Sequence, residues 1–330
     1  MKETVYIFSS GALKRKENTL SFVSDEGTKY IPVEQVREIY AFGEVDINKR
    51  VLEFLARKEI MLSYFNYYGY YVGSFYPREH HNSGFMILRQ AEAYLDEGKR
   101  MHLARQFVSG ASKNCLKILK YYNRREKELE GAIAEIEELN EGIDATGGID
   151  QLMSIEGKIK KIYYSCFNVI IDNPDFCFTG RTKRPPGDSL NALISFANSI
   201  IYTAMLSEIY QTHLDPRIGF LHATNFRRFT LNLDVAEIFK PVIGDRTIFS
   251  ALNKNIITAG DFEKDLNGIL LNDRGKKKFH EQLEEHFKQT IRHSKMKKNV
   301  SYRRLMRLEL YRLEKHLMGE DDYSPFVMDW

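Results

Sequence analysis

The sequence predicts an α+β protein in which a small N-terminal β-domain is followed by a larger all-helical domain. Short runs rich in β-branched and aromatic residues fill the first 80 residues, and from residue 86 onward most segments repeat their apolar residues at helical spacing. Between them, at 77–84, Pro, Gly, Ser and Asn cluster and interrupt both patterns. We therefore expect a β-domain over 1–80, a linker over 81–88 and a helical domain over 89–330.

The β-domain elements follow from these runs in order. Residues 4–8 and 19–23 predict strands, and the polar segment 11–18 between them predicts a turn. Further strands are expected over 31–36, 38–42 and 60–65, with one short amphipathic helix within 45–60. Gly69, between aromatic β-formers, is typical of a hairpin turn. Together these elements predict a β-sandwich-like domain with one short helix.

The helical domain is expected to begin with two or three long helices over 89–139. A further helix is predicted over 149–171 and is ended by Asn173 and Pro174. The segment 191–214 is the most apolar and is expected to be central.

Composition excludes several classes of protein. The 330 residues carry a net charge of only +3 and include 21 Phe and 19 Tyr, which argues against disorder. No apolar run approaches the roughly 18 residues that a membrane span requires, and the N-terminus shows no signal core. The three Cys residues have no CxxC spacing, so a disulfide scaffold or a zinc finger is not expected. These features favour a soluble, cytoplasmic protein.

The charge is distributed unevenly along the chain. Between Arg274 and Lys315 there are 14 Lys or Arg residues against 5 Asp or Glu. A basic C-terminal region on a nearly neutral chain points to a polyanionic partner. A solvated helical face is the simpler explanation and stays open.

Three segments hold candidate catalytic residues. Glu156 shares a helical face with apolar residues such as Leu152 and Ile159, where a carboxylate requires a partner or a cation; a salt bridge to Lys160 four residues on is the alternative. His222 ends a short apolar run after a Pro- and Gly-containing turn, a place where structural histidines are also common.

Asp234 and Glu237 lie three residues apart on one helical face and also fit a capping box. Pro241, four residues after Glu237, is expected to bend that helix. Carboxylates and an imidazole from separate helices form a plausible site for Mg²⁺ or Mn²⁺, as a phosphoryl-transfer enzyme needs.

Long motifs in one order resemble a known family. They occupy nearly the whole chain: YIFSSGALKRKENTLSF, IPVEQVREIYAFGEV and FNYYGYYVGSFYPRE in the β-domain, then IEGKIKKIYY, RPPGDSLNALISF, DPRIGFLH and LDVAEIFKPVIGDR. The chain thereby resembles the CRISPR-associated protein one family, the spacer integrase of CRISPR adaptation.

The resemblance implies the residues of the site. The glutamate of the family's EG…YY motif falls on Glu156, the histidine of its GFLH motif on His222, and its later acidic metal ligand on Glu237. Asp234 is implied as an alternative ligand or as the acceptor that orients the histidine. Lys240 stands where the family usually has arginine.

The resemblance also implies the activity and the partners. It implies a metal-dependent DNA integrase and endonuclease that inserts foreign DNA at the repeat boundary of a CRISPR array by attack of a 3′-hydroxyl. It implies a homodimer formed through the β-domains and a partnership with CRISPR-associated protein two. The residues expected to bind protospacer and repeat DNA are Arg184, Lys240, Arg292, Lys295, Lys297, Lys298, Arg303 and Arg304. A DNA-repair nuclease and a non-enzymatic nucleic-acid scaffold remain alternatives.

Overall fold

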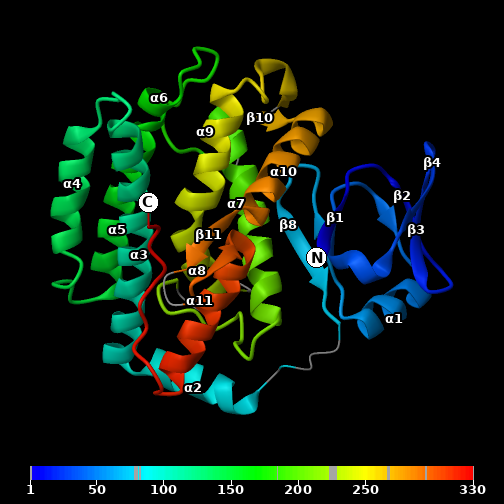
Figure 1. The fold of residues 1–330 in the computed structure, drawn as a ribbon, viewed down its shortest axis with the longest axis horizontal. Coiled ribbons are helices and arrows are strands. Elements are labelled where there is room, and N and C mark those ends of the chain that lie inside the picture. Colours follow the sequence, from blue (N-terminus) through cyan, green and yellow to red (C-terminus); the bar gives the residue numbers. More distant parts are fainter. Residues whose placement is uncertain are drawn as a thin grey trace. The chain divides into compact units, whose positions relative to one another are not determined.

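The structure is a computed structural model, and it describes residues 2–77, 81, 83–183, 185–222, 229–265, 268–293 and 296–329. The chain divides into two compact units, Met1–His80 and His81–Trp330. Figure 1 shows the β-rich N-terminal unit in blue and the predominantly helical unit from cyan to red. This is the α+β arrangement that the sequence predicts.

The N-terminal unit consists of two four-stranded sheets and one helix. Its elements are β1 (Glu3–Ile7), β2 (Gly11–Lys16), β3 (Thr19–Ser24), β4 (Gly27–Ile31), the short 3₁₀ helix η1 (Val33–Gln35), β5 (Val36–Ala41), β6 (Val45–Asp46), α1 (Lys49–Lys58), β7 (Met61–Phe65) and β8 (Tyr71–Phe75). One sheet has the order β1-β5-β7-β8 and the other β4-β3-β2-β6. In the first sheet β1, β5 and β7 run parallel, and β7 and β8 form the antiparallel pair around Gly69.

Both sheets and α1 contribute to one apolar core, which is why the unit resembles a sandwich. Leu13 and Leu20 come from the second sheet, Ile39 and Leu62 from the first, and Leu55 from α1, and all five are buried. Alternation along each strand places these residues on the inner face, so the two sheets cover each other's apolar surface.

Two short-range predictions in this unit are wrong. The polar segment 11–18, predicted as a turn, forms β2, because Leu13 is buried opposite Phe22 while the following Lys and Arg residues point to solvent. The segment 31–36, predicted as a strand, forms a 3₁₀ turn, and β5 begins only at Val36. Pro32 precedes that turn and has no N–H group to donate to a sheet.

Within its described residues, the helical unit contains long helices and two short hairpins. Its elements are α2 (Gly84–Leu95), α3 (Glu97–Asn123), α4 (Glu130–Glu141), α5 (Ile149–Ser165), α6 (Phe167–Ile170), α7 (Ser189–Tyr210), α8 (Leu231–Phe239), η2 (Lys240–Asp245), α9 (Arg246–Asn253), η3 (Ala259–Asp261), β9 (Phe262–Asp265), β10 (Gly268–Leu271), α10 (Asp273–Lys288), β11 (Thr290–His293), β12 (Lys298–Ser301) and α11 (Tyr302–Leu317). The linker predicted over 81–88 is shorter, since α2 begins at Gly84. The hairpins β9–β10 and β11–β12 depart from the all-helical expectation.

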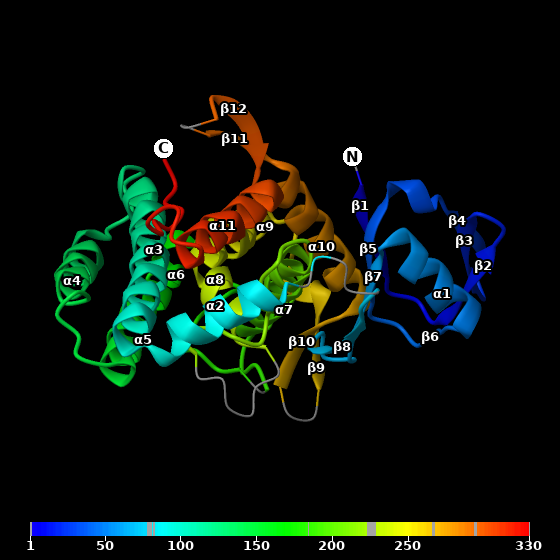
Figure 2. The ribbon, with the colours of Figure 1, turned by 90° about the horizontal axis from the view of Figure 1, so that it is seen from below.

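Helix α7 is the central element of this unit. It contacts α8, η2, β10 and α11, while α3, α4 and α5 pack together beside it (Figures 1 and 2). By length and composition α7 could cross a membrane, but 83% of its most apolar window is buried inside the protein. Burial of that kind is typical of a core helix, and the sequence predicted this position.

The chain leaves regular α-helical geometry just after α8. Residues Lys240–Asp245 form a π-helical segment that begins with Pro241 near its first position and continues into α9. Pro241 has no N–H group for the carbonyl of Glu237, four residues earlier, so the regular α-helical hydrogen bond cannot form at this point. Such π-segments are frequent at functional sites.

Candidate active site

Glu237 is a buried carboxylate held by two lysines. It comes from α8 and is 7% exposed. Its Oε2 lies 2.9 Å from Nζ of Lys160 on α5, and its Oε1 pairs with Nζ of Lys240 and accepts a hydrogen bond of 3.2 Å from the hydroxyl of Tyr202 on α7. Burial alone would raise the pKa of Glu237, but the charges of Lys160 and Lys240 outweigh it and hold the pKa below its usual range. Glu237 is therefore ionised.

Glu156, on α5, belongs to the same charge cluster. Burial and the negative charge of Glu237 raise the pKa of Glu156, and the charges of Lys160, Lys240 and His222 oppose that rise. The salt bridge between Glu156 and Lys160 that the sequence left open is not the pairing found. Within the described residues, the ammonium of Lys160 pairs with Glu237. Glu156 and Glu237 thus repel each other, and Lys160 is paired with Glu237.

Asp234 fixes the position of His222. Its Oδ2 accepts hydrogen bonds from the backbone N–H groups of Phe220 (2.6 Å) and Leu221 (3.0 Å). Its Oδ1 accepts from the backbone N–H of His222 (3.0 Å) and lies 2.7 Å from Nδ1 of the same ring. A carboxylate accepts only, so Nδ1 donates its proton to Asp234, and Nε2 is the nitrogen that carries the lone pair whenever the ring is neutral. The approach is close: a Cβ on Gly219 would lie 2.7 Å from Oδ2 of Asp234.

The capping-box alternative for Asp234 and Glu237 is wrong. Helix α8 begins at Leu231 with Thr230 as its N-cap residue, so Asp234 lies inside the first turn and Glu237 near the helix end. Both carboxylates serve tertiary contacts instead: Asp234 binds the loop that ends at His222, and Glu237 binds Lys160 of another helix.

Glu156, His222 and Glu237 have the donor chemistry of a hard-cation site. Carboxylate oxygens and a neutral imidazole suit Mg²⁺ or Mn²⁺. Part of the rise in the pKa of Glu156 comes from its repulsion by Glu237, and a bound cation relieves such repulsion. Among the described residues no group of three or more His, Cys, Asp and Glu side chains is assembled as a ready metal site. At Glu237 the place of a cation is taken by lysine ammonium groups.

Several residues of the cluster carried no separate signal in the sequence. Tyr202 sits in the apolar helix α7, where a tyrosine is equally consistent with simple core packing, and its hydroxyl donates to Glu237. Asp245, the last residue of η2, is buried, and burial raises its pKa to about 6. Lys183 shows a lowered pKa because of burial and of the positive charges of Arg181 and Lys240. The charge of Lys240 therefore acts on Lys183, in the loop before α7, as well as on Glu237.

Side-chain hydrogen bonds organise the start of α7 and part of the loop before it. Asp188 is the N-cap of α7 and accepts a 2.7 Å hydrogen bond from the backbone N–H of Asn191. The side chain of Asn191 donates to the carbonyl of Gly180 and accepts from Arg181. Arg184, predicted here as a DNA-binding residue, lies outside the described residues.

The predicted DNA-binding residues separate into exposed and buried groups. Arg292, Lys297 and Lys298 are exposed on the β11–β12 hairpin, which Figure 2 shows in orange, and Arg304 is exposed on α11. Lys295 lies outside the described residues.

Two other predicted DNA-binding residues are buried and paired with carboxylates in this structure. Nε of Arg303 lies 2.6 Å from Oε1 of the buried Glu208. Lys240 is 7% exposed and pairs with Glu237. Each of these two charges is thus neutralised by a buried carboxylate in the structure.

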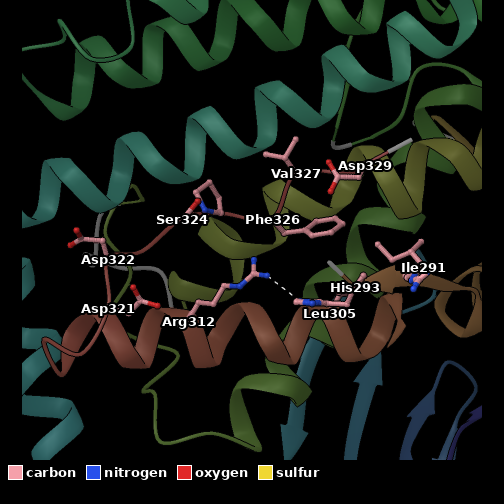
Figure 3. Close-up of a pocket in the computed structure, with 12 residues that line it drawn as sticks. Ile291, His293, Leu305, Arg312, Asp321, Asp322, Ser324, Phe326, Val327 and Asp329 are labelled. Atoms are coloured by element: carbon pink, nitrogen blue, oxygen red, sulfur yellow. Dashed lines mark hydrogen bonds between the residues drawn. The ribbon is translucent and has the colours of Figure 1, made fainter. Parts of the chain in front are cut away.

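A cavity of about 470 Å³ lies at the C-terminal tail. It is lined by Arg292 and His293 of β11, by Arg312 of α11 and by tail residues such as Phe326. Figure 3 shows Arg312 pointing toward His293, with 3.3 Å between Nη2 and Nε2. Its lining includes neither carboxylate of the cluster nor His222, so it is not the candidate active site.

Comparison with known proteins identifies what this chain is similar to. The family model described as "CRISPR associated protein Cas1" matches residues 5–285. The chain is 60% identical over 330 residues, all of both chains, to the CRISPR-associated endonuclease Cas1 2 of Thermodesulfovibrio yellowstonii. A solved structure of a Cas1 protein from Thermotoga maritima is 46% identical, has a TM-score of 0.89, and is matched over 98% of this chain and 100% of its own.

More distant solved structures share the fold. A casposase bound to its integration product has a TM-score of 0.89 at 17% identity, covering 99% of this chain and 93% of its own. A chain of a Cas6-RT-Cas1–Cas2 complex has a TM-score of 0.85 at 17% identity, and the match covers all of this chain and 36% of that longer one. At these identities the likeness is one of fold.

Proposed function

This chain belongs to the Cas1 family of CRISPR-associated proteins, and from that premise we propose that it is a metal-dependent DNA integrase and endonuclease of CRISPR adaptation. Several curated relatives are named CRISPR-associated endonuclease, among them one that is 60% identical over the whole chain, so the enzyme class is that of a DNA endonuclease. The finer proposal is that it inserts foreign DNA fragments at the repeat boundary of a CRISPR array.

The observation that carries the proposal is the charge cluster of Glu156, His222 and Glu237. In it, Asp234 holds the proton of His222 at Nδ1, 2.7 Å from its Oδ1, and so presents Nε2 as a lone-pair donor. We assign Glu156, Glu237 and Nε2 of His222 as the groups that would hold Mg²⁺ or Mn²⁺. When bound, that ion would lower the pKa of an attacking hydroxyl and offset the charge that develops on phosphate oxygens.

The proposed reaction is a transesterification. The 3′-oxygen of the incoming DNA forms a bond to a phosphorus atom of the repeat strand. The bond between that phosphorus and the 3′-oxygen of the preceding nucleotide in the repeat strand breaks. The attacking hydroxyl loses a proton, and the leaving oxygen gains one, so the step needs no oxidant or nucleotide. With water as the nucleophile, the same site would cleave DNA, which accords with the endonuclease class of the relatives. A casposase of the same fold was solved with an integration product.

The exposed basic residues supply the proposed DNA-binding surface. Arg292, Lys297, Lys298 and Arg304 are exposed, and basic side chains gain affinity for DNA by releasing its counterions. Because this substrate is chromosomal and invading DNA, we place the protein in the cytoplasm.

We assign the N-terminal unit to dimerisation and partner contact. Tyr67, Tyr68 and Val72 are exposed around the β7–β8 hairpin, and aromatic residues of this kind favour protein interfaces. A complex that contains Cas1 and Cas2 includes a chain with the present fold. We therefore propose a homodimer that binds CRISPR-associated protein two.

One experiment separates this function from its alternatives. Purified protein, CRISPR-associated protein two and a protospacer with 3′-hydroxyl ends are incubated with a repeat-containing plasmid and Mn²⁺. Joined product is expected for the wild type and for Glu138→Ala, an exposed acid on α4, but not for Glu156→Ala or His222→Ala. Cleavage without joining would indicate a repair nuclease, and full activity of Glu156→Ala would overturn the site.

A further inference from the structure

Both oxygens of Glu237 already face a positive charge. The ammonium of Lys160 lies 2.9 Å from Oε2, and that of Lys240 pairs with Oε1. The side chains of Glu237, Lys160 and Lys240 are 9%, 16% and 8% exposed, so water competes little for these contacts. An ion pair formed at this depth is maintained only while every charge keeps its partner.

The two lysines differ in what surrounds them. Nζ of Lys240 lies 4.5 Å from the centre of the Tyr202 ring, within the range of a cation–π contact. The Tyr202 hydroxyl also donates to Oε1 of Glu237. Lys240 can therefore withdraw from Oε1 and keep a favourable position over the Tyr202 ring. It also stands at the start of the π-helical segment, where the backbone is not constrained by regular α-helical bonding.

A divalent ion at Glu237 would meet these ammonium groups. Like charges a few ångströms apart in a partly buried site repel strongly. The ion can reach the carboxylate only if at least one lysine leaves it, so ion binding and lysine pairing exclude each other at Oε1.

We propose that Lys160 and Lys240 are the counter-ions of Glu237 in the ion-free protein, and that a divalent ion binds by displacing Lys240 from Oε1. The proposal rests on the assignment of Glu237 as a metal ligand. Lys240 is thus a positioning residue: it keeps the buried carboxylate neutralised before the ion arrives and lowers the apparent affinity for that ion. Removing Lys240 is therefore expected to raise the affinity for the ion and to lower the stability of the ion-free protein. Loss of a purely structural residue would not raise the affinity for the ion.

The test measures Mn²⁺ binding to the full-length protein by isothermal titration calorimetry. Lys240→Met is expected to bind Mn²⁺ about tenfold more tightly than the wild type, because one competing cation is gone. In EDTA the same variant is expected to melt at a lower temperature, and Mn²⁺ is expected to raise its melting temperature by more than it raises that of the wild type. Lys160→Met is the second variant and should change both quantities in the same directions. Lys161→Met, exposed on the same helix, is the matched control and should change neither.

A Glu237→Gln variant separates failure of this proposal from failure of the site. If Glu237→Gln binds Mn²⁺ as the wild type does, Glu237 is not a metal ligand and the assignment on which the proposal rests is wrong. If Glu237→Gln loses binding, while both lysine variants bind Mn²⁺ no more tightly than the wild type, the site stands and the exchange is overturned.

Discussion

Nδ1 of His222 lies 2.7 Å from Oδ1 of Asp234, and this contact joins the loop before α8 to the helix itself. The same carboxylate accepts three backbone N–H groups of that loop. One buried acid therefore sets both the path of the loop and the tautomer of the histidine. The consequences of removing it are testable.

Asp234→Asn is expected to impair both stability and activity. In the asparagine, one carboxylate oxygen is replaced by an NH₂ group, which would face a backbone N–H donor. At least one buried hydrogen bond is then lost, and the unfolding free energy should fall by about 1–3 kcal/mol. Loss of the acceptor that orients His222 is expected to lower integration activity about 10- to 100-fold. Urea unfolding and the plasmid assay measure the two effects, with the exposed Asp144→Asn as control. Unchanged activity in Asp234→Asn would mean that His222 needs no such acceptor.

Adjacent arginines of α11 are expected to behave differently. Arg303→Ala removes an arginine that pairs with the buried Glu208 and should reduce the unfolding free energy by about 3 kcal/mol, even though Arg307 remains with its Nε 2.6 Å from Oε2. Arg304→Ala, at an exposed position, should change it by less than about 0.5 kcal/mol. Urea titration of both variants checks this. Equal stability of the two would contradict the buried ion pair.

Neutralising the exposed basic residues should flatten the salt dependence of DNA binding. The variant carries Ala at Arg292, Lys297, Lys298 and Arg304. For each phosphate that is no longer neutralised by a basic side chain, the slope of log K against log salt becomes shallower by about 0.9. Binding to a DNA duplex at several salt concentrations gives the slope. A control carries Ala at four exposed basic residues of the N-terminal unit, Lys14, Lys29, Lys49 and Arg50. If the slope of the first variant equals that of the wild type, this region is only a solvated surface.

Acid should destabilise the protein in part through buried histidines. Burial, together with the charge of Arg246, lowers the pKa of His286 to about 3, and burial, with Lys288, lowers that of His280 to about 3. The unfolded chain takes up these protons near pH 6.5, so the unfolding free energy falls as pH decreases from about 6.5 toward 3.

The His286→Phe variant tests how much His286 contributes to the pH dependence of the unfolding free energy. Its unfolding free energy should fall less steeply with decreasing pH than that of the wild type, by up to about 1.4 kcal/mol per pH unit. Urea unfolding between about pH 7 and 5 measures the difference. Comparing the two slopes removes the contribution of other groups, such as Asp245, whose raised pKa acts in the opposite direction. Parallel curves would show that His286 titrates normally.

Much of the fold follows from local patterns. The positions of α5 and α7 were predicted because their apolar residues repeat at helical spacing, and the hairpin around Gly69 because glycine tolerates its positive φ of 77°. The prediction failed at β2, where three successive basic residues follow Leu13, the single buried residue of the strand, and make the segment look like a polar turn. A short, highly charged strand resembles a turn when the partner strand that buries its one apolar residue is not yet known.

The sequence by itself determined the order of the two units, the helices that carry Glu156 and Glu237, and, through long motifs, the family to which the chain belongs. Tertiary structure alone decided which charges pair. Lys160 stands four residues from Glu156 on one helix yet binds Glu237 of another. Local spacing describes neighbours along one element, whereas burial depends on which elements pack together, and a buried charge is satisfied by whichever opposite charge the packing brings within reach.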